Sequence, residues 1–252
     1  MKGARVVSVL LRRADLRTAF PARFAARLKG RTLLRLDRRA KYLLAVLSSG
    51  DTLVMHLGMS GSFRVERALQ TTRHDHVVFR MSSGFFVTFN DPRRFGLMDL
   101  LTPRQLATHA TLSRLGPEPL SAAFDAAALA RACRGKKTSL KAALLDQRVV
   151  AGLGNIYVVE ALYLARLSPL RRASTIATPS GAPRPAAFRL AAAIKKVLED
   201  AVDRASKAYR QSDRFRVYDR AGERCRTPRC TGSIVQRTQA GRTSYYCPVC
   251  QR

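Results

Sequence analysis

Residues 225–250 read CRTPRCTGSIVQRTQAGRTSYYCPVC, a stretch that holds four of the five cysteines in a chain of 252 residues. They form two close pairs, Cys225 with Cys230 and Cys247 with Cys250, and sixteen residues separate the pairs. Each short spacing lets two thiolates reach one ion, and two such pairs complete a tetrahedron around Zn²⁺. A segment this small cannot bury a core of its own, so the pattern favours one structural zinc over two disulfides or four unligated thiols.

The residues between the two cysteine pairs predict a short hairpin. GSIVQRT and RTSYYC read as two strands that turn at Ala240 and Gly241. Four protein sulfurs leave no open position on the ion, so the zinc is expected to be structural and not catalytic. Arg242 follows the turn directly, where an arginine can reach a DNA groove or a phosphate, although alone it would more often be a solvated turn residue. The fifth cysteine, Cys133, is expected to remain a free thiol.

Charge is the strongest signal from the composition of the chain. Lys and Arg number 46 against 17 Asp and Glu, which gives a formal net charge of +29. Self-repulsion on this scale favours a polyanionic partner, and nucleic acid is the first choice. A basic surface tuned for solubility is the alternative, and an anionic membrane ranks third because no basic amphipathic helix with exposed aromatics is evident. No secretory signal and no apolar run of about 20 residues is present. We therefore expect a cytoplasmic monomer that binds no membrane.

The order of hydrophobic patterns predicts an α+β protein. β-Strand patterns dominate the first hundred residues and predict a β-sandwich domain over 1–103, followed by a connector over 104–120. Two hairpins are expected there: KYLLAVL and DTLVMHL joined by the turn SSG, and HVVFRM and FFVTFN joined by a turn at residues 82–84. One helix is expected within FPARFAARLKG, residues 20–30, with Pro21 in its first turn and Gly30 at its C-terminal cap. A helical domain is expected over 121–215 and a zinc finger over 216–252.

Three segments carry the helical periodicity of that domain. They are SLKAALLDQRVV at 139–150, NIYVVEALYLARL at 155–167 and PAAFRLAAAIKKVLEDAVDRASKAY at 185–209. The last is long, and its apolar residues recur at intervals of three and four, which is typical of a helix with one buried face. STIATPSGAPRP, at 174–185, is rich in Pro, Ser and Thr and predicts a loop.

A series of short motifs in one order resembles a known family. RRAKYLL, MHLGMSGSFRV, HDHV, NDPRRFG, LGPEPL and GKKTSLKAALLDQRVVAGLGNIYVVEAL precede the four-cysteine segment. The series resembles the bacterial formamidopyrimidine-DNA glycosylase family, which excises oxidised purines and nicks the abasic site. The resemblance covers nearly the whole chain. It implies a helix–two-turns–helix motif in the helical domain. Its implied partner is duplex DNA that contains an oxidised purine or an abasic site, cleaved by β,δ-elimination.

The resemblance assigns Met59, Arg93 and Phe95 to a wedge that enters the DNA. An enzyme that acts on a base must flip it out of the stack and stabilise the gap. Met59 and Phe95 would fill the vacated space, while Arg93 would donate hydrogen bonds to the orphaned partner base. By residue type alone, Met59 and Phe95 would more often be core residues, but the glycine-flanked loops favour the wedge.

The resemblance also supplies residues for phosphate binding and catalysis. Lys41 matches the family's catalytic lysine near the target sugar, and Arg242 matches the finger arginine assigned to the second elimination step. His74 and Lys137 match positions that bind DNA, although an isolated His is more often structural. Asn155 opens a predicted helix whose free N–H groups form a phosphate seat, and it would also serve as a simple N-cap.

Two departures from the family pattern affect the expected activity. Family members begin Met-Pro-Glu-Leu-Pro-Glu, and the proline amine attacks the sugar while the glutamate handles protons. This sequence opens MKGARVV, so we hypothesise that Met1 is an internal methionine, and we expect the chain that begins there to be impaired. The second departure is a shortened loop between Asp213 and Phe215, which puts selectivity for oxidised guanine in doubt.

Two other classes of function stay open at this point. One is a non-catalytic protein of the family that binds DNA or its lesions. The other is a zinc-containing RNA-binding protein, which the charge alone would permit. The DPRRFG and GLGN motifs favour duplex DNA over RNA.

Overall fold

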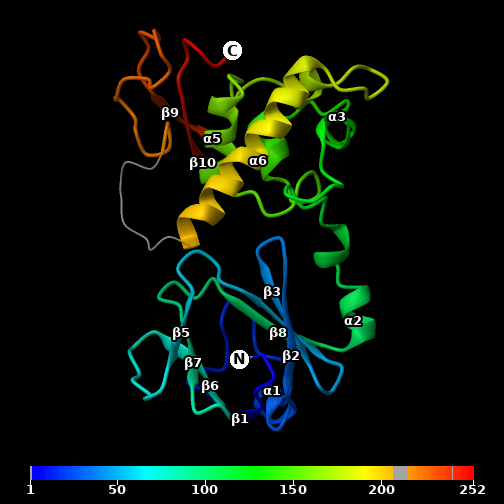
Figure 1. The fold of residues 1–252 in the computed structure, drawn as a ribbon, viewed down its shortest axis with the longest axis vertical. Helices are drawn as coiled ribbons and strands as arrows, with labels where there is room; N and C mark the ends of the chain where they lie inside the picture. Colours follow the sequence, from blue (N-terminus) through cyan, green and yellow to red (C-terminus); the bar gives the residue numbers. More distant parts are fainter. Residues whose placement is uncertain (1, 207–214, 240) are drawn as a thin grey trace. The chain divides into compact units, whose positions relative to one another are not determined.

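The structure is a computed structural model that describes residues 2–206, 215–239 and 241–252. The chain divides into two compact units, Met1–Ser113 and Arg114–Arg252. The first is built of strands and the second mainly of helices (Figure 1), which confirms the predicted α+β class. Each unit has its own buried core.

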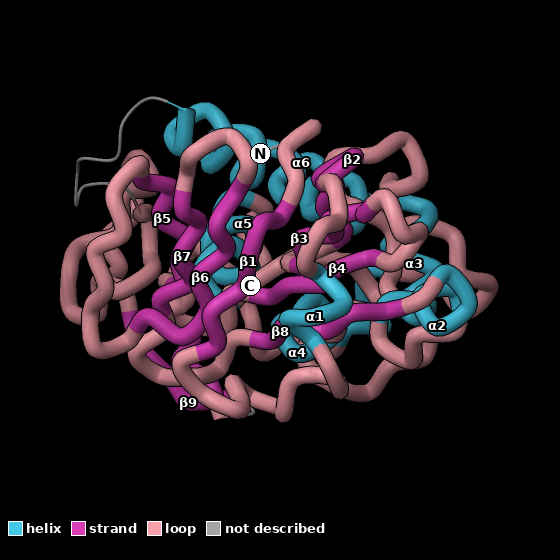
Figure 2. The backbone as a smooth tube through the Cα atoms, turned by 90° about the horizontal axis from the view of Figure 1, so that it is seen from below, coloured by secondary structure: helices cyan, strands magenta, loops and turns pink. Residues whose placement is uncertain are grey.

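Two four-stranded antiparallel sheets make up unit 1. One sheet has the order β1-β6-β7-β5 and the other β2-β3-β4-β8. The four strands of the β1-β6-β7-β5 sheet lie side by side in Figure 2. The strands are β1 (Val6–Leu11), β2 (Leu33–Arg39), β3 (Tyr42–Leu47), β4 (Thr52–His56), β5 (Ser62–Glu66), β6 (Asp75–Met81), β7 (Phe86–Asn90) and β8 (Leu97–Leu101). Apolar side chains from both sheets form one core, which is the predicted sandwich.

Turn residues set the pairing of these strands as the sequence predicted. β3 pairs with β4 across the Ser48–Gly50 turn, and β6 pairs with β7 across the turn at Gly84, whose φ is +80°. β5 and β8 were not predicted. Each directly follows a glycine-containing motif, HLGMSG or NDPRRFG, that was interpreted only as a loop. Each nevertheless places alternate apolar residues on the core side, as a half-buried strand requires.

The predicted helix at 20–30 is shorter than expected. α1 covers Phe24–Leu28 only and begins after Arg23, whose φ of +55° is left-handed, so Pro21 lies outside the helix. Phe24 and Leu28 are buried, and Gly30 follows the C-cap with a φ of +78°. The left-handed residue at the N-terminal side stops the helix from starting at the proline. Unit 1 ends with α2 (Pro103–Ala107), which has a capping box from Thr102 and Gln105.

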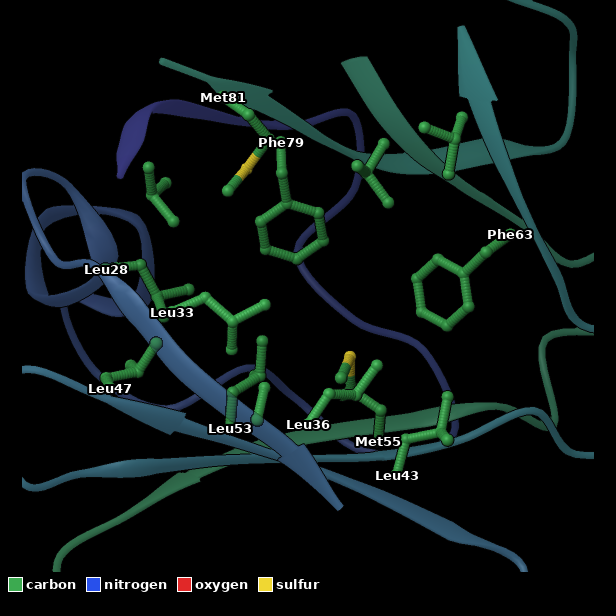
Figure 3. Close-up of a pocket in the computed structure, with 14 residues that line it drawn as sticks. Leu28, Leu33, Leu36, Leu43, Leu47, Leu53, Met55, Phe63, Phe79 and Met81 are labelled. Atoms are coloured by element: carbon green, nitrogen blue, oxygen red, sulfur yellow. The ribbon is translucent and has the colours of Figure 1, made fainter. Parts of the chain in front are cut away.

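An apolar cavity of about 220 Å³ lies between the two sheets of unit 1. Phe79 and Met81 of one sheet face Leu33, Leu53 and Met55 on the other side in Figure 3. All of the residues that line it are apolar, so the cavity offers no group that could orient a polar substrate. It is therefore a packing feature and not the functional site.

Unit 2 packs its helices around a second core. The helices are α3 (Ala126–Cys133), α4 (Leu140–Leu145), α5 (Asn155–Leu164) and α6 (Pro185–Ser206), with 3-10 turns η1 (Leu112–Arg114) at the unit boundary and η2 (Ala173–Ile176). The long helix α6 lies against α3 and α5 (Figure 1), and its predicted stripe buries Leu190 and Ile194 completely. α3 was not predicted; its N-cap is Asp125, which accepts from the Ala128 N–H.

The four cysteines flank the predicted hairpin. β9 (Val235–Gln239) pairs with β10 (Arg242–Tyr246) in antiparallel register, with Gln239 opposite Arg242. Gly241 turns with a φ of +71°, while Ala240 lies outside the described residues. Val159 and Tyr163 of α5 pack against the base of this hairpin in a small apolar cluster. Among the described helices, none is long and apolar enough to cross a membrane.

Candidate nucleic-acid interface

Two neighbouring loops of unit 1 carry the three side chains assigned to the wedge. These paired loops, residues 57–61 and 91–96, hold Met59 on one and Arg93 and Phe95 on the other. Met59 is 69% exposed and Phe95 is 45% exposed, so neither is a core residue. The Arg93 guanidinium lies 5.0 Å from the centroid of the Phe95 ring, within cation–π range. Two apolar side chains and a cation are thus presented to solvent together.

The paired loops touch through their backbones at Gly58. A Cβ placed on this residue would lie 2.5 Å from the carbonyl carbon of Phe95, and its φ of +69° is left-handed. Only glycine fits both conditions. The Gly58 N–H also donates to Nδ1 of His56 at 2.9 Å. The HLGMSG motif therefore depends on glycine for contact between the loops and not only for flexibility.

Lys41 lies at the turn between β2 and β3, exposed and preceded by Ala40 with a φ of +52°. Its charge acts on His56, which stands beside the first of the paired loops. Burial, followed by the charges of Lys41 and Arg17, lowers the pKa of His56. The structure thus brings Lys41 into the electrostatic neighbourhood of the paired loops within unit 1.

His74 is half-buried in the turn that leads into β6. Its carbonyl accepts from the N–H of Asp91, so this turn is joined to the second of the paired loops. The next residue, Asp75, has a fully buried side chain that Arg64 binds with two nitrogens, at 3.2 and 2.9 Å. Burial raises the pKa of Asp75, but the hydrogen bonds from Arg64, Thr72 and Asn90 outweigh it and lower that pKa to about 2.

In unit 2, the start of α5 and the start of β10 are held together. The Asn155 amide donates from Nδ2 to the carbonyl of Thr243 at 2.9 Å. Gly154 precedes the helix and has no side chain to cap its first N–H groups, which leaves them for another acceptor. Arg242 is exposed beside this point, at the first position of β10. Asn155 and Arg242, predicted separately, are therefore neighbours.

A buried lysine that was not predicted completes this arrangement. Lys141 of α4 is 1% exposed, and its Nζ donates to the carbonyls of Arg242 and Thr243 and to Oγ of Ser244 at 3.3, 3.0 and 2.7 Å. Burial, followed by the charge of Arg242, lowers the pKa of Lys141 to about 8. Its three hydrogens are all used within the protein, so it fixes the hairpin tip instead of meeting solvent.

Lys137 is exposed in the loop between α3 and α4. As far as the described residues show, it is not part of the hydrogen-bonded group around Lys141. It is suited to a sequence-independent contact with a phosphate, because such contacts need only a mobile cation.

Glu160, in the middle of α5, anchors the segment that leads into the hairpin. Its buried carboxylate accepts from the backbone N–H groups of Arg216, Val217 and Tyr218 at 2.8–3.0 Å. The loop predicted to be shortened runs between Asp213 and Phe215. Phe215 is described, whereas Asp213 lies outside the described residues.

Glu160 and Lys141 were both missed, and the signal for each was a single charge inside an apolar run. NIYVVEALYL and SLKAALL each place one ionisable side chain among buried neighbours. A charge is rarely buried unless it is paired or hydrogen-bonded, so these positions could have been identified as structural anchors.

The four cysteine sulfurs lie within 4.8 Å of one another. Cys225 and Cys250 are 3.7 Å apart, and Cys230 and Cys247 are 3.6 Å apart. A tetrahedral site with metal–sulfur bonds of about 2.3 Å has edges of roughly 3.8 Å, so the donor set fits a metal ion. Gly232 approaches this cluster so closely that a Cβ there would lie 2.8 Å from Sγ of Cys247. Cys133 is buried in the helical core, away from the cluster, and burial raises its pKa to about 11.

A β-sandwich unit and a helical unit with a four-cysteine hairpin, in a chain of charge +29, make up a protein of the nucleic-acid-binding class. Two family models match it: the formamidopyrimidine-DNA glycosylase N-terminal domain over residues 1–98 and the formamidopyrimidine-DNA glycosylase H2TH domain over residues 115–213. The chain belongs to the formamidopyrimidine-DNA glycosylase family, which confirms the resemblance seen in its motifs.

Relatives of known sequence and structure agree with this assignment. The chain is 53% identical to a formamidopyrimidine-DNA glycosylase of Rhodopseudomonas palustris (strain HaA2), and the match covers 100% of the chain and 94% of that relative. A Lactococcus lactis formamidopyrimidine-DNA glycosylase, solved non-covalently bound to DNA with an abasic site, has a TM-score of 0.87 at 28% identity. The match covers 100% of this chain and 94% of that protein. The MutM (Fpg) protein of Thermus thermophilus has a TM-score of 0.82 at 38% identity, and the match covers 100% of this chain and 92% of that protein.

Proposed function

We propose that this protein acts in base excision on duplex DNA, as a glycosylase for oxidised purines and a lyase for the abasic site that results. The observation that carries the proposal is the pair of touching loops, one with exposed Met59 and the other with exposed Arg93 stacked on exposed Phe95. Apolar side chains exposed beside an arginine suit a gap in a base stack. The apolar side chains replace the lost stacking, and the arginine donates hydrogen bonds to the unpaired base. A similar fold solved with carbocyclic 8-oxo-G DNA, with a TM-score of 0.86, supports the choice of substrate.

Other residues have supporting parts in this proposal. Lys41 would hold the phosphate beside the target sugar and assist proton transfer during elimination, since a compact ammonium suits both tasks. Arg242 would act at the phosphates during the second elimination. The first-turn N–H groups of α5 at Asn155, together with His74 and Lys137, would bind the DNA backbone.

The metal proposed for the four cysteines is zinc, one ion per chain. Four thiolates at tetrahedral spacing suit Zn²⁺, and with no open position the ion would have a structural role. When bound, it would keep the ends of the hairpin together. The orientation of Arg242 would then follow from Lys141 and Asn155, which bind the backbone beside it.

Binding to two duplexes tests the recognition step. The chain should bind a duplex with an abasic-site analogue more tightly than an intact duplex, because no base must be unstacked, a step that costs a few kcal/mol. Arg93→Ala should reduce this preference by about 1–3 kcal/mol, whereas Lys137→Ala should weaken both duplexes equally. Equal affinity for the two duplexes, or tighter binding to duplex RNA, would contradict the proposal.

Borohydride trapping tests the chemistry separately from binding. The chain from Met1 and the same chain preceded by the family's Pro-Glu opening segment should both bind abasic DNA, and the extended chain should form the covalent adduct. Efficient trapping by the chain from Met1 would identify a different amine as the nucleophile. Lys41→Ala in the extended chain should bind DNA but trap and cleave more slowly. An unchanged rate would remove Lys41 from the proposed site.

A further inference from the structure

We propose that Asp91 is a positioning residue that fixes the arrangement of Met59, Arg93 and Phe95. It binds both of the paired loops and the turn that carries His74. This inference rests on the proposed function, because the task it assigns to Asp91 is to hold the side chains that meet damaged DNA. Asp91 is the aspartate of the NDPRRFG motif and is fully buried.

The carboxylate of Asp91 ties the paired loops to each other. Oδ1 accepts from the hydroxyl of Ser60 at 2.6 Å, and Oδ2 accepts from the N–H of Gly96 at 2.7 Å. Oγ of Ser60 in turn accepts from the N–H of Arg93 at 3.1 Å. A relay therefore runs from the Arg93 amide through the Ser60 hydroxyl to Asp91, and it crosses from one loop to the other.

The backbone of Asp91 reaches the third segment. Its N–H donates to the carbonyl of His74 at 3.0 Å, and its carbonyl lies 2.9 Å from Nε2 of buried His76. Because its peptide and its side chain bind different segments, one residue connects the HLGMSG, HDHV and NDPRRFG motifs. These motifs are separate in the sequence, and the hydrogen bonds of Asp91 bring them together.

The tethered atoms lie next to the exposed side chains. Ser60 follows Met59 in the chain, Gly96 follows Phe95, and the tethered amide belongs to Arg93 itself. Each exposed side chain is therefore at most one residue from a bond that leads to Asp91. Holding loops in their bound arrangement lowers the ordering cost of binding, so the benefit should fall on the damaged duplex, which all three side chains must enter together.

The site also explains why a charged aspartate is tolerated in the interior. A buried carboxylate is costly unless hydrogen bonds satisfy it, and here both oxygens accept from groups that are themselves fixed by the fold. Gly96 allows the close approach, since a Cβ there would lie 3.0 Å from Oδ2 and 2.6 Å from the ring of Phe89.

Three variants test the inference in the full chain. Ser60→Ala breaks the relay, Ser60→Thr keeps a hydroxyl in place, and Asp91→Asn keeps the shape but can accept through one oxygen only. The preference for an abasic over an intact duplex should fall about fivefold in Ser60→Ala, as for the loss of one hydrogen bond. It should fall further in Asp91→Asn and stay near its original value in Ser60→Thr. Amide hydrogen exchange at Arg93 and Gly96 should accelerate in the two impaired variants without DNA.

Asp51→Asn is the matched control for a general loss of stability. Asp51 is another carboxylate of unit 1, and it accepts from Nη2 of Arg27 at 3.1 Å rather than from the paired loops. It should lower the melting temperature without changing the preference. If Asp51→Asn reduces the preference as much as Ser60→Ala does, the effect comes from stability and the inference is wrong.

Arg93→Ala separates this inference from the proposed function. If Arg93→Ala loses the preference while Ser60→Ala and Asp91→Asn keep it, Asp91 is not a positioning residue and the proposed function stands. If Arg93→Ala also keeps the preference, the proposed function itself fails.

Discussion

The paired loops of unit 1 and the hairpin of unit 2 hold exposed side chains by opposite means. In the paired loops, a buried anion, Asp91, accepts from an amide and a hydroxyl. In the hairpin, a buried cation, Lys141, donates to two carbonyls and a hydroxyl. Asp91 thus satisfies the N–H of Gly96 in a loop, and Lys141 satisfies two carbonyls at the start of β10; each gives a partner to backbone groups near the interior. A buried charge of either sign can therefore fix the backbone beside an exposed side chain.

The two regions differ in what lies beneath them. Strands of unit 1 flank the paired loops on both sides, so the sandwich core supports them. The hairpin has only a small apolar cluster of its own and four cysteines at its ends. Loss of one cysteine ligand should therefore unfold the hairpin as a whole. Loss of one hydrogen bond in the paired loops should only loosen them, because the sandwich core still supports them. The following changes test this difference, beginning with the largest expected effect.

Cys247→Ser should have the largest effect, because folding of a small metal site and binding of its ion are linked. The chain should lose its zinc, and amide exchange across β9 and β10 should become fast, while unit 1 stays protected. Metal content and hydrogen exchange by mass spectrometry measure both. Cys133→Ala is the control and should retain one zinc per chain. A full complement of zinc in Cys247→Ser would show that this sulfur is not a ligand.

Lys141→Met should rank next. It leaves two carbonyls and a hydroxyl without their donor in a buried site, which should cost about 2–4 kcal/mol of unfolding free energy. Lys137→Met, at an exposed lysine in the loop before α4, should change stability by less than about 0.5 kcal/mol. Urea unfolding compares them. Equal stability of the two variants would mean that the lysine's burial cost already cancels its hydrogen bonds.

The contribution of Asp75 should appear as a pH effect on unit 1. Its pKa is lowered from 3.8 to about 2 in the folded chain, so the stabilisation is present above about pH 4 and is lost as the pH falls through 2. The difference in stability between the unchanged chain and Asp75→Asn should shrink by about 1–2 kcal/mol across that range. Thermal unfolding at several pH values measures it. A constant difference would contradict the assigned pKa.

The smallest effect is expected from the cavity of unit 1. Val87 lines it, so Val87→Ile should add a methylene to open space and raise stability by about 0.5–1 kcal/mol. Ala143→Val adds volume to the helical core and should instead destabilise by about 1–3 kcal/mol. Melting temperatures of the two variants should move in opposite directions. A loss of stability in Val87→Ile would mean that the cavity is too rigid to accept the group.

Structural features that follow from short-range spacing in the chain were predicted well from the sequence. The cysteine spacing identified the four residues that the structure brings together, and the 3.6-residue period located α6. α5 is buried at six consecutive positions, Val158–Tyr163, so its sequence shows an apolar run, broken only by Glu160, rather than one apolar face. Turn residues located the β3–β4 and β6–β7 hairpins. These features depend on neighbours that are close in the chain, so local rules suffice. The start of α1 was misplaced, because the left-handed Arg23 is imposed by its surroundings and not by its type.

By itself, the sequence determined the α+β class, the four-cysteine cluster, the family and the side chains proposed to meet DNA. The tertiary structure alone decided what holds those side chains: Asp91 joins segments up to 31 positions apart, and Lys141 reaches Ser244 across 103 positions. Neither partner can be read from spacing, because a hydrogen bond between distant segments leaves no period in the sequence. Burial also turned these two ordinary surface residue types into anchors, and burial is a property of the fold, since a charge stays inside only where folded neighbours satisfy it.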